Sequence, residues 1–158
     1  GICAWDEKSI LVCSKDQLLR LEVPSGKQQI IAQGLDHPRA VTRDAQGTIY
    51  VSEWGQSQLI RRFDAQGKRL QPWGMPGGRP RTVLQYNPLQ LQDVRSLTID
   101  ARGRLWGAEA AHLRRFFCLS PEGKWLEDFY GPVGYVSVGA DLDDLTTVYH
   151  QANSHGPD

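Results

Sequence analysis

Two arginine–glutamate pairs recur along the chain with the same internal spacing. Arg39 precedes Glu53 by 14 residues, and Arg95 precedes Glu109 by 14 residues. One interpretation is a ligand site, because a guanidinium group binds carboxylates and phosphates through paired N–H donors. The other interpretation is structural, with each pair forming a salt bridge between neighbouring strands. The repetition favours the structural interpretation, since a ligand site is usually asymmetric.

Further side chains with chemical potential stand close to these pairs. His37 and Trp54 flank the first pair, and His112 follows the second. An imidazole can serve as a base or a metal ligand, and an indole ring can stack on a ligand. Glu53 and Glu109 are the two candidates for holding a divalent cation. The candidate ligand-binding residues are therefore His37, Arg39, Glu53, Trp54, Arg95, Glu109 and His112.

The sequence contains no motif that identifies an enzyme class. It has no Ser–His–Asp nucleophile motif, CxxC motif, P-loop or dinucleotide fingerprint. No catalytic residue can be named, and enzymatic activity stays open. The acidic stretch with Asp141, Asp143 and Asp144 has carboxylates at only two alternate positions, whereas a calcium loop needs more oxygen ligands. A solvated turn is the favoured interpretation of that stretch.

Composition excludes several classes of protein. The 158 residues include 18 Lys and Arg against 18 Asp and Glu, so the formal net charge is zero, which argues against nucleic-acid binding by general phosphate attraction. No apolar run approaches the length of a membrane span, so we expect a soluble protein, with an extracytoplasmic location left open. The three cysteines cannot form a dense disulfide framework, and Cys3 and Cys13 are either a disulfide or two thiols.

The elements that position the candidate residues belong to an internal repeat. Residues 37–74 align with residues 93–130 at a shift of 56 without a gap. The Asp-Ala-Gln-Gly segment 44–47 falls on Asp-Ala-Arg-Gly at 100–103, and Glu53 falls on Glu109. Aspartate and glycine in these positions predict tight turns, with the glycine at a positive φ.

Each copy contains four segments of strand length that are rich in β-forming residues. The predicted strands are 2–5, 9–14, 17–23 and 27–32, then 39–43, 48–52, 58–63 and 68–73, then 95–100, 104–108, 113–119 and 124–130, and finally 133–138 and 145–150. Four antiparallel strands in about 40 residues, repeated, are typical of a β-propeller blade. We therefore expect an all-β protein, a β-propeller portion of about three four-stranded antiparallel blades plus part of a fourth.

This pattern divides the chain into blades, a loop and a tail. The expected blades are 1–34, 35–74 and 93–131, with an inserted loop at 75–92, a partial blade at 132–150 and a polar tail at 151–158. The insertion is either a functional loop or a cover over part of the propeller. Because an open arc of blades exposes strand edges, we expect further sequence or other chains to complete the ring.

The repeat pattern resembles an NHL-type repeat. The resemblance is carried by His37–Val41, Asp44–Val51, Glu53 and Phe63–Gly67, and it extends over roughly residues 1–131. The third copy, from Ser96 to Trp106, is also similar to streptogramin-lyase-like and SMP-30-like propellers. The resemblance implies a ring that commonly has six blades, of which this chain would form about half.

The resemblance and the candidate residues together suggest two functions. In propellers generally, the loops before the innermost strand and after the second strand open on one face, which is the usual binding surface. The first expectation is a binding or interaction scaffold for a protein or small polar ligand, using this rim and the 75–92 insertion. The alternative is a metal-dependent hydrolase or lyase with a site near the channel mouth and a divalent cation as cofactor.

Overall fold

The computed structural model describes residues 1–80, 87–111, 114–131, 136–140 and 148–152, the last two ranges by their backbone alone. These residues form fourteen β-strands and no helix, which confirms the predicted all-β class. The described part of the chain therefore has no helix that could cross a membrane. The calcium-loop alternative at Asp141, Asp143 and Asp144 concerns residues outside this part.

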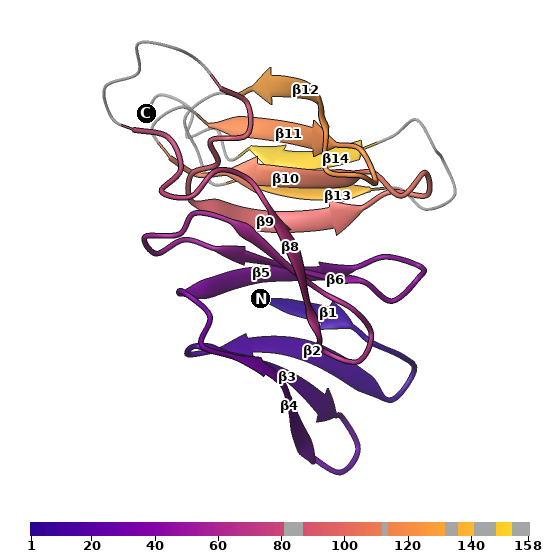
Figure 1. The fold of residues 1–158 in the computed structure, drawn as a ribbon. Coiled ribbons are helices and arrows are strands. Elements are labelled where there is room, and N and C mark those ends of the chain that lie inside the picture. Colours follow the sequence, from indigo (N-terminus) through magenta and orange to yellow (C-terminus); the bar gives the residue numbers. More distant parts are fainter. Residues whose placement is uncertain (81–86, 112–113, 132–135, 141–147, 153–158) are drawn as a thin grey trace, which may run out of the picture.

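The strands build four antiparallel sheets in sequence order (Figure 1). The first sheet contains β1 (Ile2–Ala4), β2 (Ser9–Ser14), β3 (Gln17–Glu22) and β4 (Gln28–Gln33). The second contains β5 (Pro38–Arg43), β6 (Ile49–Glu53), β7 (Ile60–Phe63) and β8 (Arg69–Trp73). The third contains β9 (Val94–Ile99), β10 (Leu105–Glu109), β11 (Arg115–Leu119) and β12 (Trp125–Tyr130). The fourth is the pair β13 (Val136–Ala140) and β14 (Val148–Ala152).

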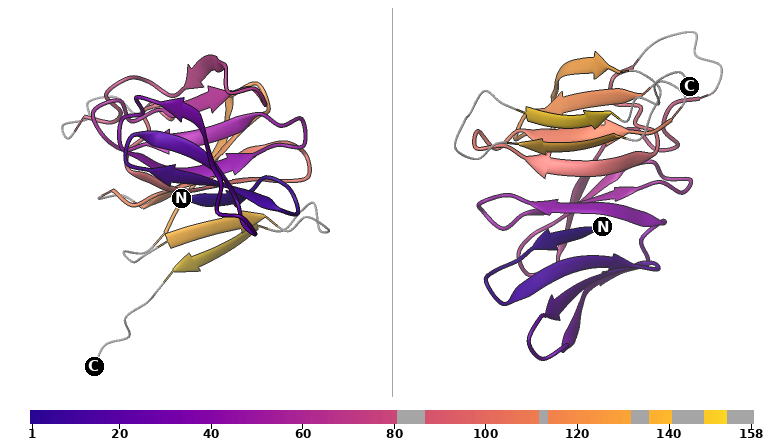
Figure 2. Two further views of the ribbon diagram at one scale, coloured as in Figure 1. Left: turned by 90° about the horizontal axis from the view of Figure 1, so that it is seen from below. Right: turned by 180° about the vertical axis from the view of Figure 1, so that it is seen from behind.

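Successive sheets stack face to face through their first strands. Strand β5 lies against β1 and β2, β9 lies against β5 and β6, and β13 lies against β9 and β10. Figures 1 and 2 show this stack from three sides. Sheets of four meandering strands that stack in this way fit the blades of a β-propeller, as the repeat predicts.

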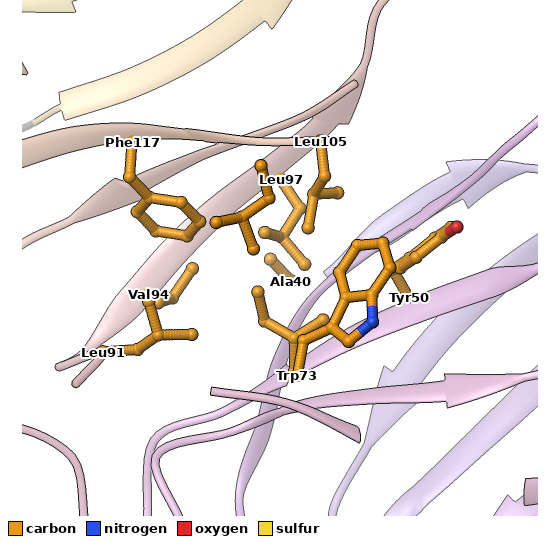
Figure 3. Packing of buried hydrophobic residues seen from close by; sticks show 10 residues of the cluster. Ala40, Tyr50, Trp73, Leu91, Val94, Leu97, Leu105 and Phe117 are labelled. Atoms are coloured by element: carbon orange, nitrogen blue, oxygen red, sulfur yellow. The ribbon is translucent and has the colours of Figure 1, made fainter. Parts of the chain in front are cut away.

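Alternation along the strands of the second sheet supplies two hydrophobic cores, because successive side chains point to opposite faces. Val41, Ile49, Val51 and Phe63 pack with Leu11 and Leu18 of the first sheet. Ala40, Tyr50, Ile60 and Trp73 pack on the other face with Leu97, Leu105, Phe117 and Leu119 of the third sheet (Figure 3). The second sheet is therefore held between its two neighbours by apolar contacts on both faces.

The repeated turns have the predicted chemistry. In the 44–48 turn, the amide of Gly47 donates to the Asp44 carbonyl at 3.1 Å, and the Asp44 carboxylate accepts from the Thr48 amide at 2.8 Å. Gly47 has φ of 86° and its repeat equivalent Gly103 has φ of 75°, a left-handed conformation that glycine adopts without a Cβ penalty. The same hydrogen-bond pattern recurs at 100–104.

The second strands of two sheets, β6 and β10, begin and end one residue later than predicted. Strand β6 includes Glu53 and β10 includes Glu109, which pair with Pro38 and Val94 of the preceding strands. In both strand pairs the register shifts next to the glutamate, so each glutamate still pairs with the preceding strand although the regular alternation ends before it. Strand β14 likewise runs to Ala152, into the segment that we expected to be a tail.

The described parts of the insertion, 75–80 and 87–92, pack onto the core. The Leu91 side chain is fully buried in the cluster between the second and third sheets. The Met75 amide donates to the Leu89 carbonyl at 2.8 Å, and the Gly77 amide donates to the Ser57 carbonyl at 3.0 Å. These parts therefore cover the junction of two sheets, while residues 81–86 lie outside the described part.

We expect Leu91→Ala to destabilise the protein by about 2–5 kcal/mol, because it removes a buried side chain and leaves a cavity. Urea unfolding followed by tryptophan fluorescence would measure the loss. Met75→Ala is the matched control, since Met75 belongs to the same insertion but is exposed. Equal unfolding free energies for the two variants would show that the insertion does not anchor the sheets.

Candidate functional site

The predicted site residues gather at one end of the second and third sheets. Arg39 and Arg95 lie near the starts of β5 and β9, and Glu53 and Glu109 are the last residues of β6 and β10. Antiparallel pairing brings the start of each first strand to the end of the next, so all four reach the same end, which we call the rim. His112 lies outside the described residues.

Glu53 is buried beneath the rim, with 1% of its surface exposed. Its Oε1 accepts a hydrogen bond from the Asp36 amide at 2.9 Å. Its Oε2 accepts from the Ser57 hydroxyl and from Arg61 Nε, both at 2.7 Å. The carboxylate is thus satisfied by the loop that precedes β5, the loop that follows β6 and a cation on β7.

Glu109 occupies the equivalent place in the third sheet and is fully buried. Its Oε1 accepts from the Gln92 amide at 3.1 Å and lies 3.3 Å from Arg115 Nη2. Its Oε2 accepts from Arg79 Nη2 at 2.8 Å. Burial raises the pKa of Glu109, and the two neighbouring guanidinium groups act against that rise.

The two glutamates perform the same local task. Each accepts the amide of the residue 17 positions earlier, and the next residue, His37 or Asp93, has a positive φ of 54° or 49°. A non-glycine residue seldom adopts this left-handed conformation, so it needs support from its surroundings. The buried carboxylate holds the loop at the point where the chain turns into the first strand of a sheet.

The predicted salt bridges Arg39–Glu53 and Arg95–Glu109 are wrong. Arg39 Nη1 instead lies 3.1 Å from Asp93 Oδ1, and Arg95 Nη2 lies 3.0 Å from Asp93 Oδ2. The glutamates sit beneath the surface and find other donors, while the arginines stay at the rim and share one aspartate. Every oxygen of Glu53 and Glu109 accepts a hydrogen bond from a protein N–H or O–H group, so the two carboxylates do not fit a metal site. Among the described residues, no group of three potential metal ligands occurs.

The aromatic and imidazole side chains complete a cluster on the rim. The Arg39 guanidinium carbon lies 5.3 Å from the Trp54 ring centroid, and the His37 ring meets Trp54 edge-on at 5.4 Å. Trp54 is 44% exposed and His37 is also exposed. Gln58 links Trp54 to Asp93, because its side-chain amide group donates to the Trp54 carbonyl at 2.6 Å and accepts from the Asp93 backbone amide at 2.7 Å.

The structure therefore brings together His37, Arg39, Trp54 and Arg95 around Asp93. Two partly exposed guanidinium groups share one carboxylate, and the Asp36 carboxylate beside His37 is the second negative charge of the cluster. His37 Nδ1 lies 2.9 Å from Asp36 Oδ1, and this hydrogen bond lowers the pKa of Asp36. An accessible indole beside a partly exposed guanidinium can bind an anionic or polar group through charge-assisted hydrogen bonds and ring contact.

A buried ionic network lies beside Glu109. Arg115 is fully buried on β11, and its Nη1 lies 3.7 Å from Asp128 Oδ2 on β12. Both Asp128 oxygens are buried and have no hydrogen-bond partner in the described part of the chain. Burial raises the pKa of Asp128 to about 6 and lowers the pKa of Arg115. Arg115 Nη2 also donates to the Pro88 carbonyl at 2.8 Å, which ties the network to the insertion.

Sequence reasoning missed the partners that decide these environments. Asp93, Gln58, Arg61, Arg79 and Arg115 hold the candidate residues in place, and none was predicted. For Asp93 a signal existed, because it aligns with His37 at the shift of 56 and stands two residues from Arg95. Arg79 gave no such signal, since it belongs to the unrepeated insertion.

Of the two alternatives for Cys3 and Cys13, the structure has two free thiols and no disulfide between them.

Comparisons with known proteins show the fold and no family. No protein-family model and no curated protein matches the sequence. The structure of U3-55K is similar with a TM-score of 0.60 and 16% identity, over 87% of this chain and 40% of that one. A protein of unknown function from Bacteroides caccae matches with a TM-score of 0.60 and 15% identity, over 87% of this chain and 47% of that one.

A gluconolactonase from Xanthomonas campestris is also similar in structure. Its TM-score is 0.59 at 16% identity, and the match covers 82% of this chain and 47% of the gluconolactonase. This chain thus spans less than half the length of each of the three structures. The likenesses support the propeller-type stack of sheets.

We expect Asp128→Asn to abolish a pH dependence of stability. Asp128 has a folded pKa of about 6 against an ordinary value of 3.8, so the folded state holds the proton more tightly and stability falls as pH rises from about 4 to 6. The amide side chain of the variant cannot ionise, so the variant should be more stable than the parent above pH 6 by roughly 1–3 kcal/mol and equal to it near pH 4.

Urea unfolding at several pH values between 4 and 7 would measure this difference. Glu127→Gln is the control, because it makes the same change of carboxylate to amide at the neighbouring position, where the side chain is 43% exposed. A difference between D128N and the parent that stays constant across this range would contradict the assignment of the titration to Asp128.

Proposed function

We propose that this chain is a binding scaffold whose ligand or partner contacts lie on the rim. The observation that carries the proposal is the cluster of His37, Arg39, Trp54 and Arg95 around Asp93. We assign its blades to the NHL type on the sequence pattern of the second copy. The three similar structures are compatible with this proposal through their fold alone.

The physical character of the cluster supports a binding role. The Trp54 ring is outside all three buried clusters, so its position is not required by core packing. Aromatic and arginine side chains dominate binding energy where they meet a partner. The partly exposed guanidinium groups of Arg39 and Arg95 can bind an anionic group, and we propose an acidic peptide segment or a small carboxylate as the ligand class.

Isothermal titration calorimetry of the parent and its variants with hexaglutamate would test this proposal. We expect saturable binding that weakens by about ten-fold in Trp54→Ala and in Arg39→Gln, because each removes one of the central contacts. Trp125→Ala is the control, since Trp125 is an equally exposed tryptophan on β12. Binding that is absent in the parent, or that is the same in all variants, would overturn the proposal.

The alternative is a metal-dependent hydrolase, for which the specific observation is the similar gluconolactonase structure. Glu53 and Glu109 do not serve this alternative, because buried donors already occupy both carboxylates. A cation site would have to draw on other residues. Hydrolysis of gluconolactone by this chain that a chelator abolishes and calcium restores would favour the alternative over the scaffold.

We also propose that a further sheet, from additional sequence or from another chain, covers the outer face of the first sheet. On this face Ile2, Val12, Leu19 and Ile30 form one row across four strands. Ile2 is 66% exposed and Ile30 is 54% exposed, whereas Leu11 and Leu18 on the other face are buried against the second sheet. Such an apolar row on a sheet face favours association.

Native mass spectrometry would test whether this face needs a cover. We expect the 158-residue chain alone to associate into species above 17.7 kDa, because the apolar row is open to solvent. Ile30→Lys should shift the distribution towards the monomer, and Val23→Lys, an exposed position after β3, should not. A parent protein that is monomeric at every concentration would contradict this proposal.

A further inference from the structure

A second candidate site lies at the end of the sheets opposite the rim. A groove of about 580 Å³ opens between the 44–48 turn of the second sheet and the 100–103 turn of the third. These turns join β5 to β6 and β9 to β10, whereas Glu53 and Glu109 stand at the far ends of β6 and β10. The groove is lined by three arginines, Arg43, Arg62 and Arg102, and by Tyr50.

These arginines differ from most others in the described chain. Arg20, Arg39, Arg61, Arg79, Arg95, Arg104 and Arg115 all pair with a carboxylate. Within the described residues, none of the three arginines of the groove takes part in an ion pair. The Arg43 guanidinium is held against the first sheet, because its Nε donates to the Ala4 carbonyl at 3.1 Å and its carbon lies 5.5 Å from the Trp5 ring centroid. Arg62 and Arg102 are therefore the guanidinium groups that solvent or an anion in the groove would balance.

Arg62 is the most constrained of the three. Its guanidinium carbon lies 4.3 Å from the Trp73 ring centroid and 5.6 Å from that of Tyr50, so two aromatic rings fix its position. Its Nη1 donates to the Gln71 carbonyl at 3.3 Å. Its Nε is buried and has no hydrogen-bond partner among the described residues. The side chain is therefore positioned with donor capacity unused.

Among the described residues, the two aspartates of the groove form no ion pair with these arginines, and their oxygens accept hydrogen bonds from other groups. Asp44 accepts from the Thr48 amide at 2.8 Å and from the Tyr50 hydroxyl at 3.0 Å. Asp100 accepts from Arg104 Nε at 2.7 Å and from Trp106 Nε1 at 3.0 Å. Arg104 balances the charge of Asp100, whereas Asp44 keeps its negative charge, so Arg62 and Arg102 together with Asp44 leave the groove with a positive charge.

The blade repeat does not explain the three arginines. At the shift of 56, Arg43 aligns with Ile99, Arg62 aligns with Cys118, and Arg102 aligns with Gln46. Asp44 and Asp100, by contrast, align with each other and make the same turn. The turns belong to the architecture of the blades, whereas the arginines between them are particular to this one groove.

From these observations we infer that the groove between the 44–48 and 100–103 turns binds a small, multiply charged oxyanion, a phosphate or polycarboxylate compound. Guanidinium groups bind both chemistries through paired donors. Arg62 supplies the positioned contact, and Arg102 on the 100–103 turn supplies a second guanidinium group. This site is separate from the rim, so the inference does not depend on the proposed scaffold function.

Isothermal titration calorimetry of the 158-residue chain with pyrophosphate, and separately with citrate, would test the inference. We expect saturable binding of at least one of them at low ionic strength, weakened by added salt. Arg62→Gln and Arg102→Gln should each weaken it by about ten-fold, since each removes a charge-assisted contact. The stronger of the two ligands identifies the class of anion.

Arg69→Gln and Arg39→Gln are the matched controls. Arg69 also lacks an ion pair in the described chain but donates to the carbonyls of Gln33 and Gly34 away from the groove, and Arg39 belongs to the rim. Both controls should bind the anion as the parent does. Because Arg102 is exposed on a turn, its variant keeps the test valid even if R62Q fails to fold. Failure of both anions to bind, or equal binding by all four variants, would overturn the inference.

Discussion

The arrangement of the sheets depends on a buried carboxylate at the end of each of two second strands. Glu53 and Glu109 each accept the amide of the loop that leads into the first strand of their own sheet. The chain then turns through a left-handed residue, His37 or Asp93, which this hydrogen bond helps to hold. Because a buried carboxylate without donors is very unfavourable, each glutamate also needs a cation, and Arg61 and Arg79 provide it. The start of each sheet is thereby fixed relative to its second strand.

The insertion is part of this arrangement. It contributes Arg79 to Glu109, the Pro88 carbonyl to Arg115 and the Leu91 side chain to the core between the second and third sheets. The charges beside Glu109 are consequently shielded from water by a segment that the repeat does not contain. Asp128 lies in the same buried environment without hydrogen-bond donors among the described residues. Burial therefore raises its pKa, and the nearby Arg79 acts against that rise without cancelling it.

The two ends of the sheets have different chemistry. At the rim, Arg39 and Arg95 share Asp93 beneath an exposed Trp54, which leaves a partly balanced, aromatic surface. At the opposite end, the turn aspartates satisfy their own loops, so Arg43, Arg62 and Arg102 stay without counter-ions among the described residues. The difference arises because Asp93 presents its carboxylate to both rim arginines, whereas Asp44 and Asp100 are used within the turns.

The order and approximate limits of the strands, the turn glycines and the location of the candidate residues at one end of the blades all follow from the sequence. They depend on alternation, turn chemistry and a repeat of 56 residues, which are local or periodic properties. Only the tertiary structure decided which side chains pair. Arg39 and Glu53 both lie at the rim, but Glu53 is buried and Arg39 is partly exposed. Glu53 therefore accepts from the Asp36 amide and pairs with Arg61, whereas Arg39 pairs with Asp93 at the start of the next sheet. Contacts between residues far apart in the chain, such as Arg79 with Glu109, depend on how the insertion folds back over the sheets, and no local pattern encodes that path.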